Sequence, residues 1–81
     1  MKDTHLQALQ LIKKGEWDSA HHLVQDYSDP FSCHIHAYLH RIEGDLANAN
    51  YWYRRAGLDM SDKAQDQELV DLFTMLSKST D

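Results

Sequence analysis

The positions of glycine and proline constrain the fold of this chain most strongly. The 81 residues contain three glycines and one proline, spaced so that the segments between them have the length of short helices. An apolar series at helical spacing leads up to Gly15, and Pro30 disfavours helical geometry at the residue before it. Glycine also tolerates the left-handed conformation in which helices commonly end. The sequence therefore predicts short helices that end near these residues.

Five helices are expected, and no segment is typical of a strand. Apolar stripes at helical spacing define the helices, and Asp45 and Ser61 are suitable N-caps for the last two. The expected helices run from residue 3 to Gly15, from Trp17 to about Tyr27, from Phe31 to Gly44, from Leu46 to about Ala56, and from 62 to 78. The predicted fold class is all-α.

Two of the turns have similar sequences. "GEWDSA" begins at Gly15 and "GDLANA" at Gly44, so each has a glycine, an acid, a large apolar residue, two spacers and an alanine. A small residue one turn into the second helix lets two helix axes approach closely. These turns predict helical hairpins over 3–27 and 31–57, with the helix over 62–78 covering the exposed apolar face of the second hairpin.

In these features the chain resembles the tetratricopeptide repeat (TPR) family. The family's small and large positions in the second unit fall on Cys33, His36, Ala37, His40, Ala49 and Tyr53. The resemblance covers roughly residues 4–57 and implies an array of TPR-like helix–turn–helix units. The stretch from His34 to Gly57 also resembles small bacterial proteins with a similar Tyr-Trp-Tyr-Arg-Arg-Ala-Gly string, which implies a bacterial, cytoplasmic protein.

The TPR resemblance also implies a binding surface, because the first helices of such hairpins line a concave groove. Carried over to this chain, the groove includes His5 and Leu9 from the first unit, and His34, Tyr38 and Arg41 from the second. Tyr51, Arg54 and Arg55 are further candidates, since exposed aromatic rings and arginines are favoured binding anchors. The expected function is a non-enzymatic protein–protein interaction module that binds a protein or peptide.

The sequence also predicts specific side-chain contacts and buried positions. Arg41 and Asp45 lie on either side of the Gly44 turn and are expected to pair. Tyr53 takes a core position, and Trp52 is expected to pack on the last helix against Phe73. Cys33 is expected to be a small buried residue.

The histidines leave two interpretations open. His36 and His40 lie one helical turn apart on one face, with Glu43 near the next turn. Zinc requires three or four ligands, and the adjacent His21 and His22 point in different directions and form no second pair. The first interpretation is a set of buried, hydrogen-bonded imidazoles. The alternative is a metal- or small-anion-binding domain built on His36, His40 and Glu43.

Composition excludes several classes of function. The net charge of −5 disfavours nucleic acid as a partner, because an acidic chain repels phosphates. No apolar run approaches the ~20 residues that span a bilayer. The single cysteine and the lack of a signal-like start favour a reduced cytoplasmic compartment. No catalytic constellation or cofactor motif is evident. Two hairpins and one helix form a thin core, so a homodimer is an alternative to a monomer.

Overall fold

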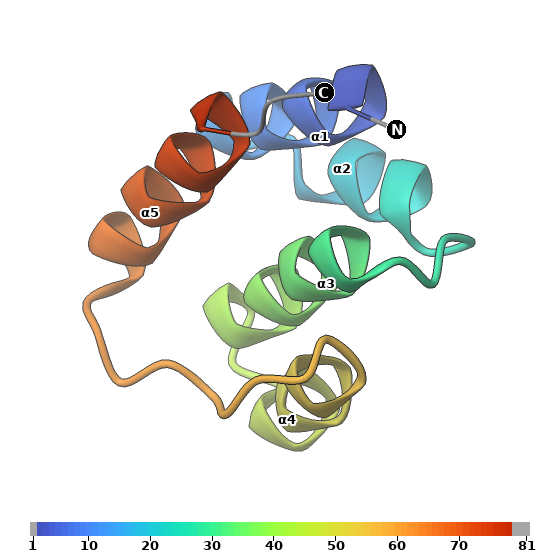
Figure 1. The fold of residues 1–81 in the computed structure, drawn as a ribbon. Helices are drawn as coiled ribbons and strands as arrows, with labels where there is room; N and C mark the ends of the chain where they lie inside the picture. Colours follow the sequence, from blue (N-terminus) through green and yellow to red (C-terminus); the bar gives the residue numbers. More distant parts are fainter. Residues whose placement is uncertain (1, 79–81) are drawn as a thin grey trace.

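The computed structural model describes residues 2–78, which form five α-helices and no strand. The helices are α1 (Lys2–Lys13), α2 (Trp17–Val24), α3 (Pro30–Ile42), α4 (Leu46–Arg55) and α5 (Gln65–Ser77). Short turns join α1 to α2 and α3 to α4, whereas a longer connection leads from α4 to α5 (Figure 1). The all-α class and the number of helices are confirmed.

The two similar turns have the same backbone structure. Gly15 has φ of 81° and Gly44 has φ of 88°, both in the left-handed region that strains any residue with a side chain. The amide of Glu16 donates to the carbonyl of Leu11 at 2.9 Å, and the amide of Asp45 donates to that of His40 at 3.0 Å. These bonds define the Schellman motif, which satisfies the last carbonyls of α1 and α3.

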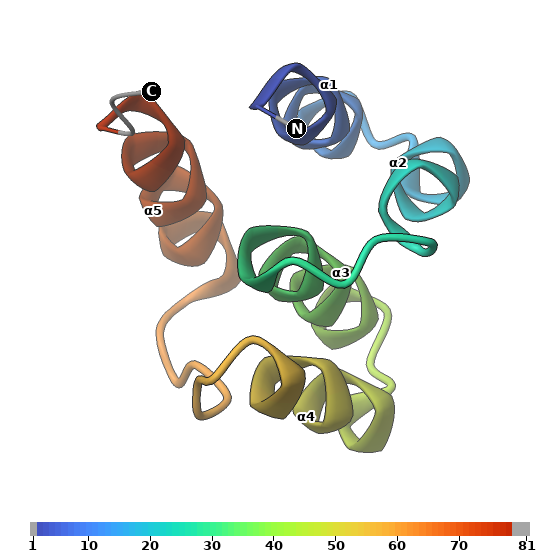
Figure 2. The same ribbon diagram turned by 45° about the vertical axis from the view of Figure 1, so that its right-hand side comes forward.

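Helix α3 lies at the centre of the molecule. Figures 1 and 2 show the other four helices around it, and it packs against each of them. Every residue from Ser32 to His40 is consequently buried. The three histidines of α3 therefore lie in the interior, where each ring must find a packing partner or a hydrogen bond.

The start of α3 is fixed by a polar contact with α1. Asp29 accepts a hydrogen bond from the Ser32 amide at 3.0 Å, and Pro30 occupies the first turn. The His5 Nε2 atom lies 3.0 Å from both the Asp29 carboxylate and the Ser32 hydroxyl. Because His5 is buried in this contact, it does not belong to an open groove surface as the TPR resemblance implied.

Alanines lie where the helices approach closely. Ala8, Ala20, Ala37 and Ala49 are fully buried, whereas Ala56 is half-buried. Between α3 and α4, Ala37 and Ala49 form a cluster with Tyr53, and Trp52 packs against it. The prediction that small residues lie at the helix contacts is confirmed at these four positions.

A larger side chain at Ala49 is therefore expected to destabilise the protein. Ala49→Leu forces extra methylenes into a filled contact, and overpacking of this kind costs about 1–3 kcal/mol. The exposed Ala47 on the same helix provides the control, since Ala47→Leu meets solvent. Urea denaturation of both variants measures the difference; equal stabilities would show that α3 and α4 can move apart without cost.

Most helix ends lie within two residues of the predictions, but two ends differ by three residues. Helix α2 ends at Val24, so Tyr27 lies beyond it and is exposed. Helix α5 begins at Gln65 rather than at 62, because Ser61 accepts a hydrogen bond from the Lys63 amide at 3.2 Å instead of capping the helix. The Lys63 carbonyl accepts a hydrogen bond from Arg41, which holds this segment outside the helix.

The position of α5 also differs from the prediction. It packs on α1 and α3, the first helices of the two hairpins, rather than on the second hairpin alone. Trp52 does not pack against Phe73 as expected; its ring stacks on His36 at a centroid distance of 3.9 Å. Phe73 instead joins the core cluster shared by α1, α2, α3 and α5.

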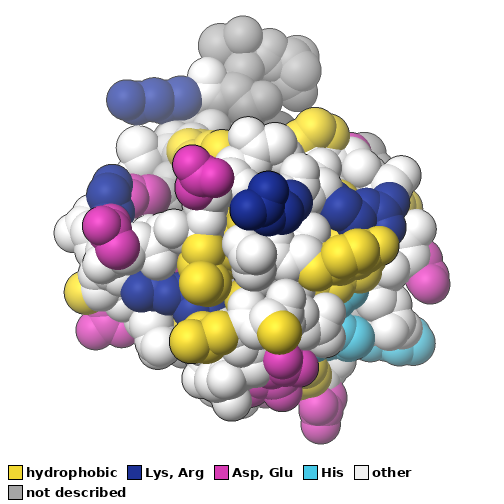
Figure 3. Space-filling model, turned by 90° about the horizontal axis from the view of Figure 1, so that it is seen from below, with side chains coloured by type: hydrophobic (Ala, Val, Ile, Leu, Met, Phe, Trp, Pro, Cys, Tyr) yellow, Lys and Arg dark blue, Asp and Glu magenta, His cyan; other side chains and the backbone are white. Residues whose placement is uncertain are grey.

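The surface mixes charged and apolar side chains. The face in Figure 3 shows charges of both signs interspersed with hydrophobic groups, and histidines reach the surface at one edge. Within residues 2–78, no helix has both the length and the apolar character needed to cross a membrane. Cys33 is a buried free thiol, as expected.

Candidate functional site

Two polar clusters lie against opposite parts of α3. The first, which we call the Glu68 cluster, consists of Glu68 on α5 with His34, Arg41 and Tyr53. The second, the histidine cluster, consists of His21 on α2 with His36 and His40 on α3. The Glu68 cluster joins α5 to α3 and α4, and the histidine cluster joins the consecutive helices α2 and α3, so each depends on how the helices pack.

The Glu68 carboxylate accepts three hydrogen bonds although only 3% of the residue is exposed. The donors are the Arg41 Nη1 atom at 2.7 Å, the Tyr53 hydroxyl at 2.5 Å and the His34 Nε2 atom at 3.2 Å. Burial opposes ionisation of Glu68, but the bonds from these three donors outweigh it and lower the pKa. Glu68 is therefore a buried anion held by α3 and α4.

Tyr53 is kept protonated by the same cluster. Burial and the hydrogen bond to the Glu68 carboxylate both raise the pKa of Tyr53 well above its ordinary value. The hydroxyl consequently acts as a donor across the whole neutral range. Arg41 completes the charge balance, since its guanidinium is the cation nearest to the buried carboxylate.

The three groove residues predicted on α3 all contact α5 or the segment before it. The Tyr38 hydroxyl donates to the Gln65 carbonyl at 2.9 Å, and His34 and Arg41 donate to Glu68. Arg41 thus pairs with Glu68 and not with Asp45, which instead caps α4 by accepting from the Asn48 amide. Helix α5 lies on the surface where the TPR resemblance places a bound partner.

The remaining predicted partner residues lie elsewhere. Tyr51, Arg54 and Arg55 are exposed on α4. The Arg55 guanidinium lies 4.9 Å from the centroid of the Trp52 ring and 5.8 Å from that of Tyr51. Among the described residues, no hydrogen bond or ion pair joins these three side chains to α5. The structure therefore does not bring them together with His34, Tyr38 and Arg41.

The histidine cluster brings together three imidazole rings. Their centroids are 4.6 Å apart for His21 and His36, 4.9 Å for His36 and His40, and 5.2 Å for His21 and His40. One nitrogen of each ring lies within 4.8 Å of the other two. The Nδ1 atom of His40 donates to the Glu43 carboxylate at 2.5 Å. This arrangement can hold a metal ion.

Two tryptophans stack on two of the three imidazole rings, those of His21 and His36. Trp17 stacks on His21 with the planes 10° apart, and its Nε1 atom donates to the Leu39 carbonyl at 2.7 Å. Trp52 stacks on His36 with the planes 16° apart. Flat contacts of this kind restrict rotation of the imidazoles and fix the direction of their nitrogens.

The surroundings keep two of the rings neutral. Burial, together with the nearby His21, His40 and Arg55, lowers the pKa of His36 to about 4. The pKa of His21 is also lowered, first by burial and then by His40. Near pH 7 both rings therefore have an unprotonated nitrogen, which is the form that a metal ion requires.

Glu68 and His21 were not predicted as site residues. The signal for Glu68 was its place on the apolar stripe of α5, one and two turns before Leu72 and Leu76, where an acid is unexpected. The signal for His21 was its position next to the buried Ala20 on the helix that precedes α3. Both signals become specific only when the packing partner is known.

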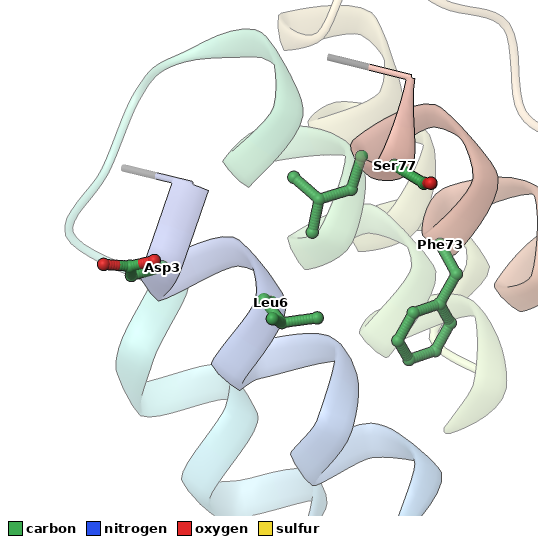
Figure 4. Close-up of a pocket in the computed structure, with 5 residues that line it drawn as sticks. Asp3, Leu6, Phe73 and Ser77 are labelled. Atoms are coloured by element: carbon green, nitrogen blue, oxygen red, sulfur yellow. The ribbon is translucent and has the colours of Figure 1, made fainter. Parts of the chain in front are cut away.

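A small apolar pocket lies between the ends of α1 and α5. It has a volume of about 240 Å³ and is lined by Leu6, Phe73 and Leu76, with Asp3 and Ser77 beside them. In Figure 4, the labelled Leu6 and Phe73 come from the two facing helices. Its lining is mainly apolar and its volume is sufficient for an apolar side chain. No histidine or cysteine is among the residues that line it.

Comparison with known proteins finds no relative. The chain matches no protein-family model, and neither the curated proteins nor the solved structures give a match.

Proposed function

We propose that this chain is a non-enzymatic, TPR-like protein-interaction module of the cytoplasm that binds an acidic amphipathic helix on α1 and α3. In this proposal α5 of the same chain fills the groove on α1 and α3 when no partner is bound. The observation that carries it is the Glu68 contact, because a buried carboxylate with three donors from α3 and α4 is the recognition expected for an acidic ligand. Tyr51, Arg54 and Arg55 remain a second predicted contact surface, on α4.

The contacts of α5 define the chemistry of a suitable partner. Its apolar face places Leu72 and Leu76 in the same core cluster as Leu9 of α1. Glu68, one turn before Leu72, supplies the charge that Arg41 neutralises. A partner helix is expected to have the same order: a glutamate followed by apolar residues at the next two turns, as helix-in-groove ligands do.

The connection before α5 is long enough for α5 to leave the groove and be replaced by a partner helix. Residues 56–64 form no regular secondary structure, and most of them are exposed. A tether of this length presents α5 to the groove at an effective concentration in the millimolar range, which a free partner must overcome. Two copies that exchanged α5 would form the predicted homodimer with the same contacts.

A competition experiment with the full chain tests this proposal. A fluorescent peptide of residues 62–78 is titrated with the wild type and with Leu72→Ala. Removing the buried Leu72 side chain weakens the resident α5 by about 2–5 kcal/mol, so the variant should bind the peptide at least ten times more tightly. A peptide carrying Glu68→Gln is the matched control and should bind at least ten times more weakly.

Two results would contradict the proposal. One is a Leu72→Ala variant that remains helical by circular dichroism yet binds no peptide. The other is equal binding of the wild-type and Glu68→Gln peptides, which would remove the role of the carboxylate. If Leu72→Ala unfolds, Leu69→Ala at a half-buried position of α5 provides the milder variant.

A further inference from the structure

The histidine cluster contains one buried polar atom that the described residues do not satisfy. The His36 Nδ1 atom is buried and has no hydrogen-bond partner, and His36 as a whole is 4% exposed. Among the side-chain hydrogen bonds of the described residues, none involves a ring nitrogen of His21 or of His36. A buried polar atom without a partner costs about 1–3 kcal/mol, so this arrangement calls for an explanation.

His40 has the carboxylate hydrogen-bond partner that metal-binding histidines usually have. A histidine that binds a metal through one nitrogen typically donates its other N–H to a carboxylate. The hydrogen bond from His40 Nδ1 to Glu43 provides this partner at 2.5 Å and leaves Nε2 with the free lone pair. Glu43 is the C-cap of α3, where its backbone position is fixed by the helix end.

We propose that His21, His36 and His40 bind one divalent transition-metal ion of the zinc class, with Glu43 orienting His40. Three imidazoles suit zinc, copper and nickel better than the hard cations magnesium and calcium, which prefer oxygen ligands. With three protein ligands, a fourth position of the tetrahedron remains for water or an external ligand. This inference is independent of the proposed interaction function, since it depends on different residues.

The distances make such a site accessible with small movements. In a tetrahedral zinc site with Zn–N of about 2.0–2.1 Å, ligand nitrogens lie roughly 3.3 Å apart. The three nitrogens are now within 4.8 Å of one another, so they must close by up to about 1.5 Å. His21 is only half-buried and lies with Trp17 on the short helix α2, so a small shift of this helix can supply most of the movement while the two rings stay stacked.

The test is a zinc titration of the untagged full chain after treatment with a chelator. Calorimetry should give one zinc per chain, and Zn²⁺ should raise the melting temperature. Tryptophan fluorescence should change in parallel, because Trp17 and Trp52 stack on two of the ligands. A wild type that binds no zinc, or binds it without a change in melting temperature, would overturn the proposal.

Adjacent histidines provide the matched pair of variants. His21→Ala removes a ligand and should weaken zinc binding at least tenfold, whereas His22→Ala alters an exposed ring outside the cluster and should change it less than twofold. Glu43→Gln should weaken binding 10–100-fold at unchanged stoichiometry, as loss of an outer-shell partner does. Equal losses in His21→Ala and His22→Ala would assign the binding to surface histidines instead. If His21→Ala unfolds without metal, His21→Gln replaces it in the same comparison.

Discussion

Replacing Glu68 by alanine is expected to lower the free energy of unfolding by about 3–5 kcal/mol, the cost of breaking a buried ion pair by removing one partner. The substitution leaves the Arg41 guanidinium, whose side chain is 13% exposed, without its carboxylate. It also leaves the buried Tyr53 hydroxyl without an acceptor. A domain of this length has roughly 4–12 kcal/mol of stability, so the substitution should remove between about a quarter and all of it.

Two further variants identify the cause of this loss. Glu68→Gln keeps the volume and one acceptor oxygen but removes the charge, and should cost about 2 kcal/mol. Asp71→Asn, on the same helix, breaks a surface pair with Lys63 and should leave the stability nearly unchanged. Urea denaturation followed by circular dichroism measures all three. Equal effects at Glu68 and Asp71 would mean that the buried cluster contributes nothing specific.

Mild acid is expected to destabilise the metal-free protein through His36. The pKa of His36 is about 4 in the folded state and 6.5 for the ordinary group, so the unfolded chain binds more protons between these values. Stability is therefore fully present above pH 6.5 and falls as the pH drops towards 4. The loss should be roughly 2–3 kcal/mol by pH 4.5. The groups that face His36 are His21, His40 and Arg55, from α2, α3 and α4.

A non-titrating ring isolates this effect. His36→Phe keeps a flat ring against Trp52, and the difference in unfolding free energy between pH 7 and pH 4.5 should shrink by roughly 2–3 kcal/mol. His22→Phe, at an exposed position, should keep the full difference. Both are measured by urea denaturation in the presence of a chelator. Glu68 interferes little, because a carboxylate with a lowered pKa loses its contribution only at pH values below about 4.5. An unchanged pH dependence in His36→Phe would show that folding does not shift the pKa of His36.

Local sequence signals predicted the helices well because they act within one turn. Gly15 and Gly44 can end a helix whatever packs around them, because the left-handed conformation is a local property. The Asp45 cap likewise requires only the Asn48 amide, three residues further along the chain. The start of α5 could not be predicted in this way. It depends on Arg41, which is distant in the sequence and binds the Lys63 carbonyl.

The sites depend on packing and were therefore only partly predictable. The pair His36 and His40 follows from helical spacing, but the third ring comes from α2 and requires the crossing of α2 with α3. Similarly, His34, Tyr38 and Arg41 share a face of α3, yet the sequence does not tell that α5 covers this face. Glu68 reads as one acid among several in α5 until its donors are in place.

Native-state hydrogen exchange of α5 in the wild type and in Glu68→Gln tests most directly whether α5 is a separable occupant of the groove on α1 and α3. If it is, the amides of α5 exchange through a local opening of lower free energy than those of α3 after Pro30. Glu68→Gln should then accelerate the exchange of α5 more than that of α3. Equal opening free energies for both helices, shifted together by the substitution, would show that α5 is an inseparable part of one cooperative core.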